Sequence, residues 1–211
     1  YQIPNLPHDD VPAGTEENKK LIRKVGEPRK FDFKPKDHVD LGVSLGIIDI
    51  ERASKVSGSR FTYLKGEAVL LEFALVNFAL ERLIKEGFIP VLPPMLIKKE
   101  ITDKLGYWHG GGNENYYFVR DYEEIGEGKK ERELDLYLVG TAEHSLVSMH
   151  QGETFDSKEL PRRYVGFSSC FRREAGSYGK DVKGILRVHQ FDKVEMVAFV
   201  RPEDEKEQHE K

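Results

Sequence analysis

Two long extended segments in the C-terminal half constrain the fold more than any other feature of the sequence. Residues 164–173 and 185–200 are rich in β-branched and aromatic residues, and the turn-forming stretch 174–184 joins them. The simplest arrangement for two such segments is a large antiparallel hairpin. The sequence therefore predicts an antiparallel sheet, with helices from the rest of the chain flanking it.

A long helix is expected before the hairpin. From Glu67 to Lys85, 13 of 19 positions are apolar, and Gly87 supplies a stop signal. An apolar stripe this wide covers more than one face of a helix. The pattern fits either a central core helix or a helix shared between the core and a subunit interface.

The segment that follows this helix is extended and proline-bearing. Residues 88–97 include Pro90, Pro93 and Pro94. Proline has no N–H to give to a sheet, so this segment cannot be an ordinary central strand. We expect it at a sheet edge or at an interface.

The remaining elements are expected to be short. They comprise strands at 21–25, 54–59, 60–64 and 134–139 and helices at 37–45, 98–105 and 141–152. The glycine-rich residues 107–112 are expected to form a loop. Residues 120–134 hold 10 charged residues in 15, which is typical of a solvated excursion.

Composition excludes several classes of protein. The 211 residues are 38% hydrophobic and carry 33 Lys and Arg against 37 Asp and Glu, a formal charge of −4. These values exclude disordered and collagen-like chains and argue against coating of nucleic acid by bulk charge. The longest apolar run, residues 68–76, is interrupted by Glu72 and is too short to span a bilayer. With one cysteine, Cys170, and no signal-peptide pattern, we expect no membrane association and a cytoplasmic location.

Both ends of the chain indicate a piece of a longer protein. The chain begins without Met on a proline-rich stretch, and it closes on an acidic segment after Pro202 that reads as the start of a helix. We expect residues 1–20 to be a linker from a missing N-terminal arm. Residues 21–211 would then form part of one catalytic domain.

Common catalytic signatures are absent from the sequence. Neither a phosphate-binding loop of the GxxxxGK[ST] type nor a dinucleotide-binding GxGxxG stretch occurs in its required context. The seven histidines lack metal-binding spacing, so His144 and His150 are expected to be ordinary surface or packing residues. Cys170 has no CxxC partner and lies in a predicted strand, which favours a buried structural thiol.

The second hairpin strand carries a charged face. Arg187, His189, Phe191, Lys193 and Glu195 alternate with residues that point the other way. By the same alternation, the first strand places Arg172 and Glu174 on one face and Arg173 on the opposite one. If the two charged faces coincide, arginines, carboxylates and a flat ring converge on one patch of sheet. A solvated sheet face with cross-strand ion pairs would show the same pattern.

These residues also carry a resemblance. The stretches 171–177 (FRREAGS), 178–184 and 187–195 (RVHQFDKVE) are similar to the second signature motif of class II aminoacyl-tRNA synthetases, in the form found in seryl-tRNA synthetases. Further similar stretches follow in the family's order: 26–29 (GEPR), Asp37-His38, 55–61 (KVSGSRF) and Thr141-Ala142-Glu143. The helix Glu67–Lys85 with the segment after it resembles the class's first motif, which forms the dimer interface, and Pro94 would be its characteristic proline. The resemblance implies an α+β class II catalytic core, cut before the third motif.

The resemblance also implies roles in ATP binding. Arg172 would be the catalytic residue and would bind both the α-phosphate and the serine carboxylate, since a planar guanidinium can bridge two anions. Glu174 would accept a hydrogen bond from the adenine amino group. The main chain of Val188 would read the base edge, Phe191 would stack on the base, and Arg187 would contact the triphosphate.

The serine pocket implied by the resemblance uses four side chains. Thr141 and Glu143 would line it together with Arg172, and Glu195 would hold the substrate ammonium or hydroxyl group. The reaction implied is ATP-dependent formation of seryl-adenylate and transfer of the seryl group to tRNA(Ser), by a homodimer joined through the Glu67–Lys85 helix and the Pro94 strand. Mg²⁺ is implied as well, with its ligands expected largely beyond Lys211, and no metal ligand is assigned within the chain.

Some features depart from the family's pattern. The 107–112 loop and the charged stretch 120–134 differ from the segment expected before Thr-Ala-Glu, and His144 stands where a small apolar residue is more usual. Two other functions stay open. One is an amino acid:carrier-protein ligase of the same fold, and the other is a non-catalytic synthetase-like dimeric regulatory module. The intact Arg172, Glu174 and Glu195 disfavour the non-catalytic module.

Overall fold

The computed structural model describes residues 9, 11–107, 112–119, 136–175 and 184–210. The chain divides into two compact units, Tyr1–Asp37 and His38–Lys211. In the first unit the only regular element among the described residues is the 3-10 helix η1, Glu16–Asn18. The strand expected at 21–25 does not form, and Leu21, Ile22 and Val25 are at least 80% exposed because no second strand pairs with them. The domain boundary expected at residue 20 stays a prediction.

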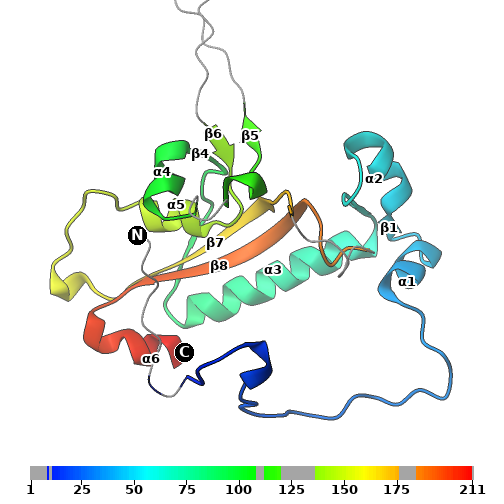
Figure 1. Ribbon diagram of the computed structural model, residues 1–211, viewed down its shortest axis with the longest axis horizontal. Coiled ribbons are helices and arrows are strands. Elements are labelled where there is room, and N and C mark those ends of the chain that lie inside the picture. The colour runs from blue at the N-terminus through cyan, green and yellow to red at the C-terminus, as the bar shows by residue number, and fades with distance from the viewer. Residues whose placement is uncertain (1–8, 10, 108–111, 120–135, 176–183, 211) are drawn as a thin grey trace, which may run out of the picture. The chain divides into compact units, whose positions relative to one another are not determined.

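The predicted hairpin is confirmed and forms the main sheet of the second unit (Figure 1). β7, Arg162–Phe171, pairs with β8, Gln190–Phe199, in antiparallel register from Arg162↔Phe199 to Phe171↔Gln190. β3, Ile89–Val91, adds to β7 in parallel, so the sheet order is β3-β7-β8. Pro90 lies in β3 at the sheet edge, as its missing N–H requires.

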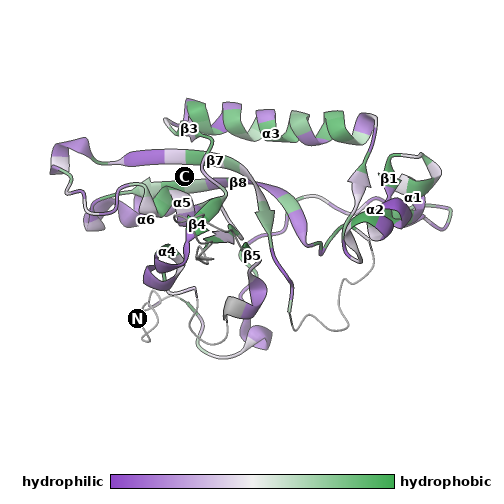
Figure 2. Cartoon of the chain, turned by 90° about the horizontal axis from the view of Figure 1, so that it is seen from above, coloured by the Kyte–Doolittle hydropathy of each residue, from purple (hydrophilic) through white to green (hydrophobic). Residues whose placement is uncertain are grey.

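Helices lie on both faces of this sheet (Figure 2). α3, Glu67–Lys85, has the bounds that the apolar pattern predicts, and Gly87 follows it with a left-handed φ of 85°. On the other face lies α5, Glu143–Ser148, which ends four residues before the predicted Gly152. The small core joins Ala142 and Leu146 to Tyr164 of β7.

A second, smaller sheet lies beside α5. Its strands are β4, Leu96–Lys98, β6, Leu136–Leu138, and β5, Phe118–Val119, in the antiparallel order β4-β6-β5. α4, Lys99–Lys104, follows β4 at the position predicted for a helix. Pro94 lies in the connection between β3 and β4, so its assignment to a strand is wrong. Its carbonyl oxygen accepts a hydrogen bond from Ser145 Oγ (2.7 Å), which ties the connection to α5.

One predicted strand near the start of this unit is a helix instead. After α1, His38–Ser44, and β1, Ile48–Asp49, residues Ile50–Ser57 form α2. Asp49 caps α2 by accepting from the backbone N–H of Arg52 (3.1 Å). The cap outweighs the strand preference of the residues around Gly58, and only Tyr63–Leu64 form a strand, β2.

The C-terminal segment is helical, as expected after Pro202. η4, Pro202–Asp204, leads into α6, Glu205–Glu210, and η2 and η3 are single turns at Gly112–Asn115 and Ser157–Glu159. Most of the 107–112 loop and the charged stretch 120–134 lie outside the described residues. Within the described part of the chain, no helix is both long and apolar enough to cross a membrane.

Candidate active site

The two faces of the β7–β8 hairpin are built from different residues. On the α5 side, β7 presents Tyr164, Gly166, Ser168 and Cys170, and all four are buried. Gly166 allows α5 to approach closely, because a Cβ there would lie 2.9 Å from Leu146 Cδ1. Burial raises the pKa of the Cys170 thiol, which agrees with the structural role predicted for this residue.

Thr141 connects α5 to the charged face of β8. Its Oγ1 donates a hydrogen bond to Glu195 Oε2 (2.6 Å) and accepts one from Lys193 Nζ (3.0 Å). The backbone N–H of Glu143 also donates to this oxygen (3.3 Å). Thr141, Glu143 and Glu195, predicted to line one pocket, therefore lie together although 54 residues separate Thr141 from Glu195.

Arg172 lies on the same side of the sheet. Its Nε donates to the carbonyl oxygen of Gly140 (3.0 Å), and its guanidinium carbon is 5.4 Å from the centre of the Phe191 ring. β7 ends at Phe171, so Arg172 and Glu174 are beyond the strand and the strand-parity argument does not apply to them. Arg172 is half-buried and Arg173 is exposed, and their placement on opposite faces stays a prediction.

Glu174 and Arg187 form an ion pair at the open end of the hairpin, with Glu174 Oε2 2.7 Å from Arg187 Nη1. Glu174 has a left-handed backbone, φ 51°, which turns the chain after Arg172. β8 begins at Gln190, so placing Arg187 and His189 on the strand was wrong. His189 instead joins the two ends of the hairpin, because its Nδ1 donates to the carbonyl oxygen of Arg172 (2.9 Å).

Three aromatic rings, those of Tyr107, Tyr116 and His144, pack together beside Glu143. His144 is completely buried, and its ring centre is 4.1 Å from that of Tyr107 and 5.6 Å from that of Tyr116. Burial, with the nearby Arg172 and Lys193 charges, lowers the pKa of His144 to about 4, so the imidazole is neutral at pH 7. Burial and a hydrogen bond to Glu143 raise the pKa of Tyr107, and burial raises that of Tyr116 to about 12. Both tyrosines are therefore protonated and can donate hydrogen bonds.

This arrangement brings cations, carboxylates and a flat ring to one side of the sheet. A family described as the tRNA synthetase class II core domain (G, H, P, S and T) matches residues 123–211. A serine–tRNA ligase of Acidothermus cellulolyticus is 50% identical over 197 residues, covering 93% of this chain and 44% of the relative. The serine–tRNA ligase of Thermobifida fusca is 46% identical over 207 residues, covering 98% and 46%.

Over nearly its whole length, the chain is similar to seryl-tRNA synthetases. It spans less than half the length of these curated relatives. Among solved seryl-tRNA synthetases, that of Pyrococcus horikoshii complexed with ATP is 47% identical with a TM-score of 0.73, covering 85% of this chain and 37% of the other. The cytoplasmic enzyme of Naegleria fowleri in complex with AMP is 35% identical with a TM-score of 0.80, covering 93% and 44%. The α+β class II fold expected from the resemblance is confirmed.

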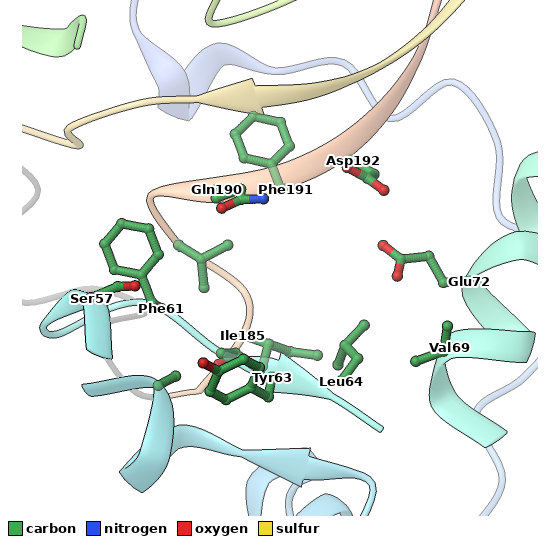
Figure 3. Close-up of a pocket in the computed structure, with 13 residues that line it drawn as sticks. Ser57, Phe61, Tyr63, Leu64, Val69, Glu72, Ile185, Gln190, Phe191 and Asp192 are labelled. Carbon is green, nitrogen blue, oxygen red and sulfur yellow. The ribbon is translucent and has the colours of Figure 1, made fainter. Parts of the chain in front are cut away.

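A cleft of about 510 Å³ lies next to α2, β2 and α3, and Phe191 is among the residues that line it. Figure 3 shows the carboxylates of Glu72 and Asp192 approaching each other across it. Burial, together with the charge of Asp192, raises the pKa of Glu72. Val188 and Gln190 also line this cleft.

The family resemblance did not single out three residues that the structure places at the site. Lys193 shares the parity of Phe191 and Glu195, which was a usable signal, but Tyr107 and Tyr116 reach the pocket only through tertiary contacts. Among the described residues, no group of three or more His, Cys, Asp or Glu side chains could hold a metal ion.

Proposed function

We propose that the full-length protein activates L-serine with ATP to form seryl-adenylate and transfers the seryl group to tRNA(Ser). The observation that carries the proposal is the cluster in which Arg172 lies over Phe191 while Thr141 binds Glu195. Similarity to serine–tRNA ligases over nearly the whole chain, and the ATP and AMP complexes of two similar solved structures, support it.

The proposed chemistry requires no protein base. The serine carboxylate is already ionised at pH 7, and one of its oxygens forms a bond to the α-phosphorus of ATP while the bond to the bridging oxygen breaks and pyrophosphate leaves. Arg172 would bind both the attacking carboxylate and the α-phosphate, which brings two anions together and stabilises the developing charge. A terminal ribose hydroxyl of the tRNA would then attack the acyl carbon and release AMP.

The nucleotide would lie along the Arg172–Phe191 side of the sheet. Phe191 would stack on the adenine ring and Glu174 would accept from its amino group. In the structure Glu174 already pairs with Arg187, so ATP binding would place the base and the triphosphate on either side of an existing ion pair. The backbone of Val188 would read the base edge.

Serine would be held by the opposite end of the same face. Glu195 and Thr141 would take the ammonium and hydroxyl groups, with Glu143 and its Tyr107 partner beside them. A substrate without the hydroxyl, such as alanine, would leave a buried polar group unpaired and would be rejected.

Self-association through α3 is part of the proposal. None of its residues is buried, and Leu70, Leu71 and Phe78 are each more than 60% exposed. An exposed apolar patch of this kind marks an interface. We place the dimer contact on α3 and the Pro94 connection, and we place the working enzyme in the cytoplasm with its Mg²⁺ ligands outside the described residues.

Pyrophosphate exchange with ATP tests this function on the full-length protein. Exchange that depends on serine, and not on glycine or alanine, followed by charging of tRNA(Ser), is the expected result. Exchange followed by loading of a carrier protein instead of tRNA would indicate the carrier-protein ligase. No exchange with any amino acid would indicate the non-catalytic module.

A further inference from the structure

Lys193 contacts both side chains that are proposed to recognise serine. Its Nζ donates to Thr141 Oγ1 (3.0 Å) and forms an ion pair with Glu195. Lys193 and Glu195 are two residues apart on β8 and therefore point to the same face. Their side chains are only 32% and 19% exposed, so the pair lies inside the site and is not a solvated surface contact.

The direction of these hydrogen bonds is determined by chemistry. An ammonium group has three donors and no acceptor, and a threonine hydroxyl has a single proton. Because Lys193 donates to Thr141, the hydroxyl proton of Thr141 must go elsewhere, and it goes to Glu195 Oε2 (2.6 Å). The result is a one-way chain from Lys193 through Thr141 to Glu195, with a charged group at each end.

We propose that Lys193 is a positioning residue for serine recognition. It holds the Thr141 hydroxyl and the Glu195 carboxylate in one fixed arrangement. The oxygen atoms that would accept hydrogen bonds from the ammonium and hydroxyl groups of serine are therefore held in place before serine binds. The inference rests on the proposed function and adds to it a residue that acts through two others without touching the reacting atoms. Lys193 also balances the charge of Glu195 before substrate arrives.

Substitution of Lys193 separates this role from a purely structural one. In the full-length protein, Lys193→Met and Lys193→Gln remove the charge, and Lys193→Arg keeps it. With the charge removed, we expect the KM for serine in pyrophosphate exchange to rise about tenfold or more, because a hydrogen bond to a charged group is lost. The KM for ATP should change less than about threefold. The preference for serine over alanine should fall, because Thr141 and Glu195, which would bind the serine hydroxyl, are no longer held in place.

Lys65→Met is the matched control. Lys65 makes a similar ion pair, with Asp49 (3.0 Å), whose carboxylate is also well buried, but this pair lies at β1. Loss of the pair should lower the melting temperature without changing the KM for serine. Lys193→Arg should keep the KM for serine within about threefold of wild type, since an arginine can donate to the same oxygens.

Three results would overturn the inference. The KM for serine could stay unchanged in Lys193→Met or, if that variant does not fold, in Lys193→Gln. It could instead fall, which would mean that Lys193 competes with the substrate ammonium for Glu195. Lys193→Arg could also raise KM as much as removal of the charge does. A wild-type protein without serine-dependent exchange would refute the proposed function itself and the inference with it, whereas a normal wild-type protein with unaffected variants would refute the inference alone.

Discussion

The two faces of the β7–β8 hairpin differ in how completely the chain covers them. On the α5 face, every β7 residue from Tyr164 to Cys170 that points to α5 is buried, and the β8 residues that share this face between Phe191 and Glu195 are partly buried. Thr141 contacts Lys193 and Glu195. On the α3 face, Gln190, Asp192 and Met196 of β8 are exposed. We call the α5 face of the hairpin, whose side chains are buried or partly buried, the finished face. The α3 face, where β8 side chains and the helix α3 are exposed, is called the open face.

This difference separates two requirements of the function proposed above. Charged groups that must act in fixed positions need hydrogen-bond partners supplied by the chain itself, and the α5 face has them. The helix α3 on the other face carries exposed apolar side chains, with Leu71 at 62% and Phe78 at 70% exposure. Such a surface gains most from burial against another polypeptide. Under the proposed function, catalytic positioning and assembly lie on opposite faces of one sheet.

The largest expected effect comes from the arginine pair at the end of β7. Arg172→Ala should lower kcat/KM for serine-dependent exchange by about a thousandfold, because it removes a group that stabilises the developing charge. Arg173→Ala, its exposed neighbour, serves as the control and should stay within about threefold of wild type. Equal losses in the two variants would show that the finished face does not hold the substrates.

His144 makes the stability of the α5 face dependent on pH. Its pKa is lowered to about 4 in the folded protein, whereas an unfolded histidine titrates near its ordinary 6.5. The unfolded state therefore binds more protons between these values, and the free energy of unfolding should fall as pH drops from 6.5 toward 4. From pH 7 to 4.5 this one group should contribute a loss of about 2 kcal/mol.

His144→Leu removes the titrating group and keeps the site apolar. Denaturant unfolding at several pH values should then show a shallower acid limb than wild type. If the free energy of unfolding falls equally steeply with decreasing pH in the two proteins, His144 is not held neutral by burial.

Phe191 tests whether the finished face binds the nucleotide. Phe191→Leu keeps most of the apolar volume and loses the flat ring, which should weaken ATP binding by about 1–3 kcal/mol, as for base–aromatic stacking. The melting temperature should hardly move. ATP affinity by calorimetry and the melting temperature are measured on the same full-length preparation, and a large fall in melting temperature with unchanged affinity would make Phe191 a core residue.

The open face should show the smallest effect on folding. Leu71→Glu places a charge on the exposed side of α3, and its free energy of unfolding in dilute solution should stay within about 0.5 kcal/mol of wild type. Sedimentation should nevertheless show weaker self-association, while the control Glu81→Gln on the same helix should not. Unchanged association in Leu71→Glu would remove α3 from the interface.

Local pattern predicted the elements that form each face, and tertiary contacts decided the rest. α3 and the hairpin follow from dense apolar and β-branched runs, whose periodicity is readable in one sequence. α2 was missed because its start depends on the Asp49 cap, and the prediction considered only the β-branched residues and glycines of this segment. Tyr107 and Tyr116 were missed because they reach His144 across 37 and 28 residues of chain, a proximity that no local pattern encodes.

The central claim is that neighbouring residues of β8 serve different purposes because they point to opposite faces. Glu195→Gln and Asp192→Asn are matched carboxyl-to-amide changes on the Thr141 side and on the Glu72 side of this strand. Serine-dependent pyrophosphate exchange by the two full-length variants tests the claim directly. We predict that kcat/KM falls about a hundredfold or more in Glu195→Gln, where a charged partner of the substrate is lost, and stays within about threefold in Asp192→Asn. Equal losses, or a greater loss in Asp192→Asn, would contradict the account.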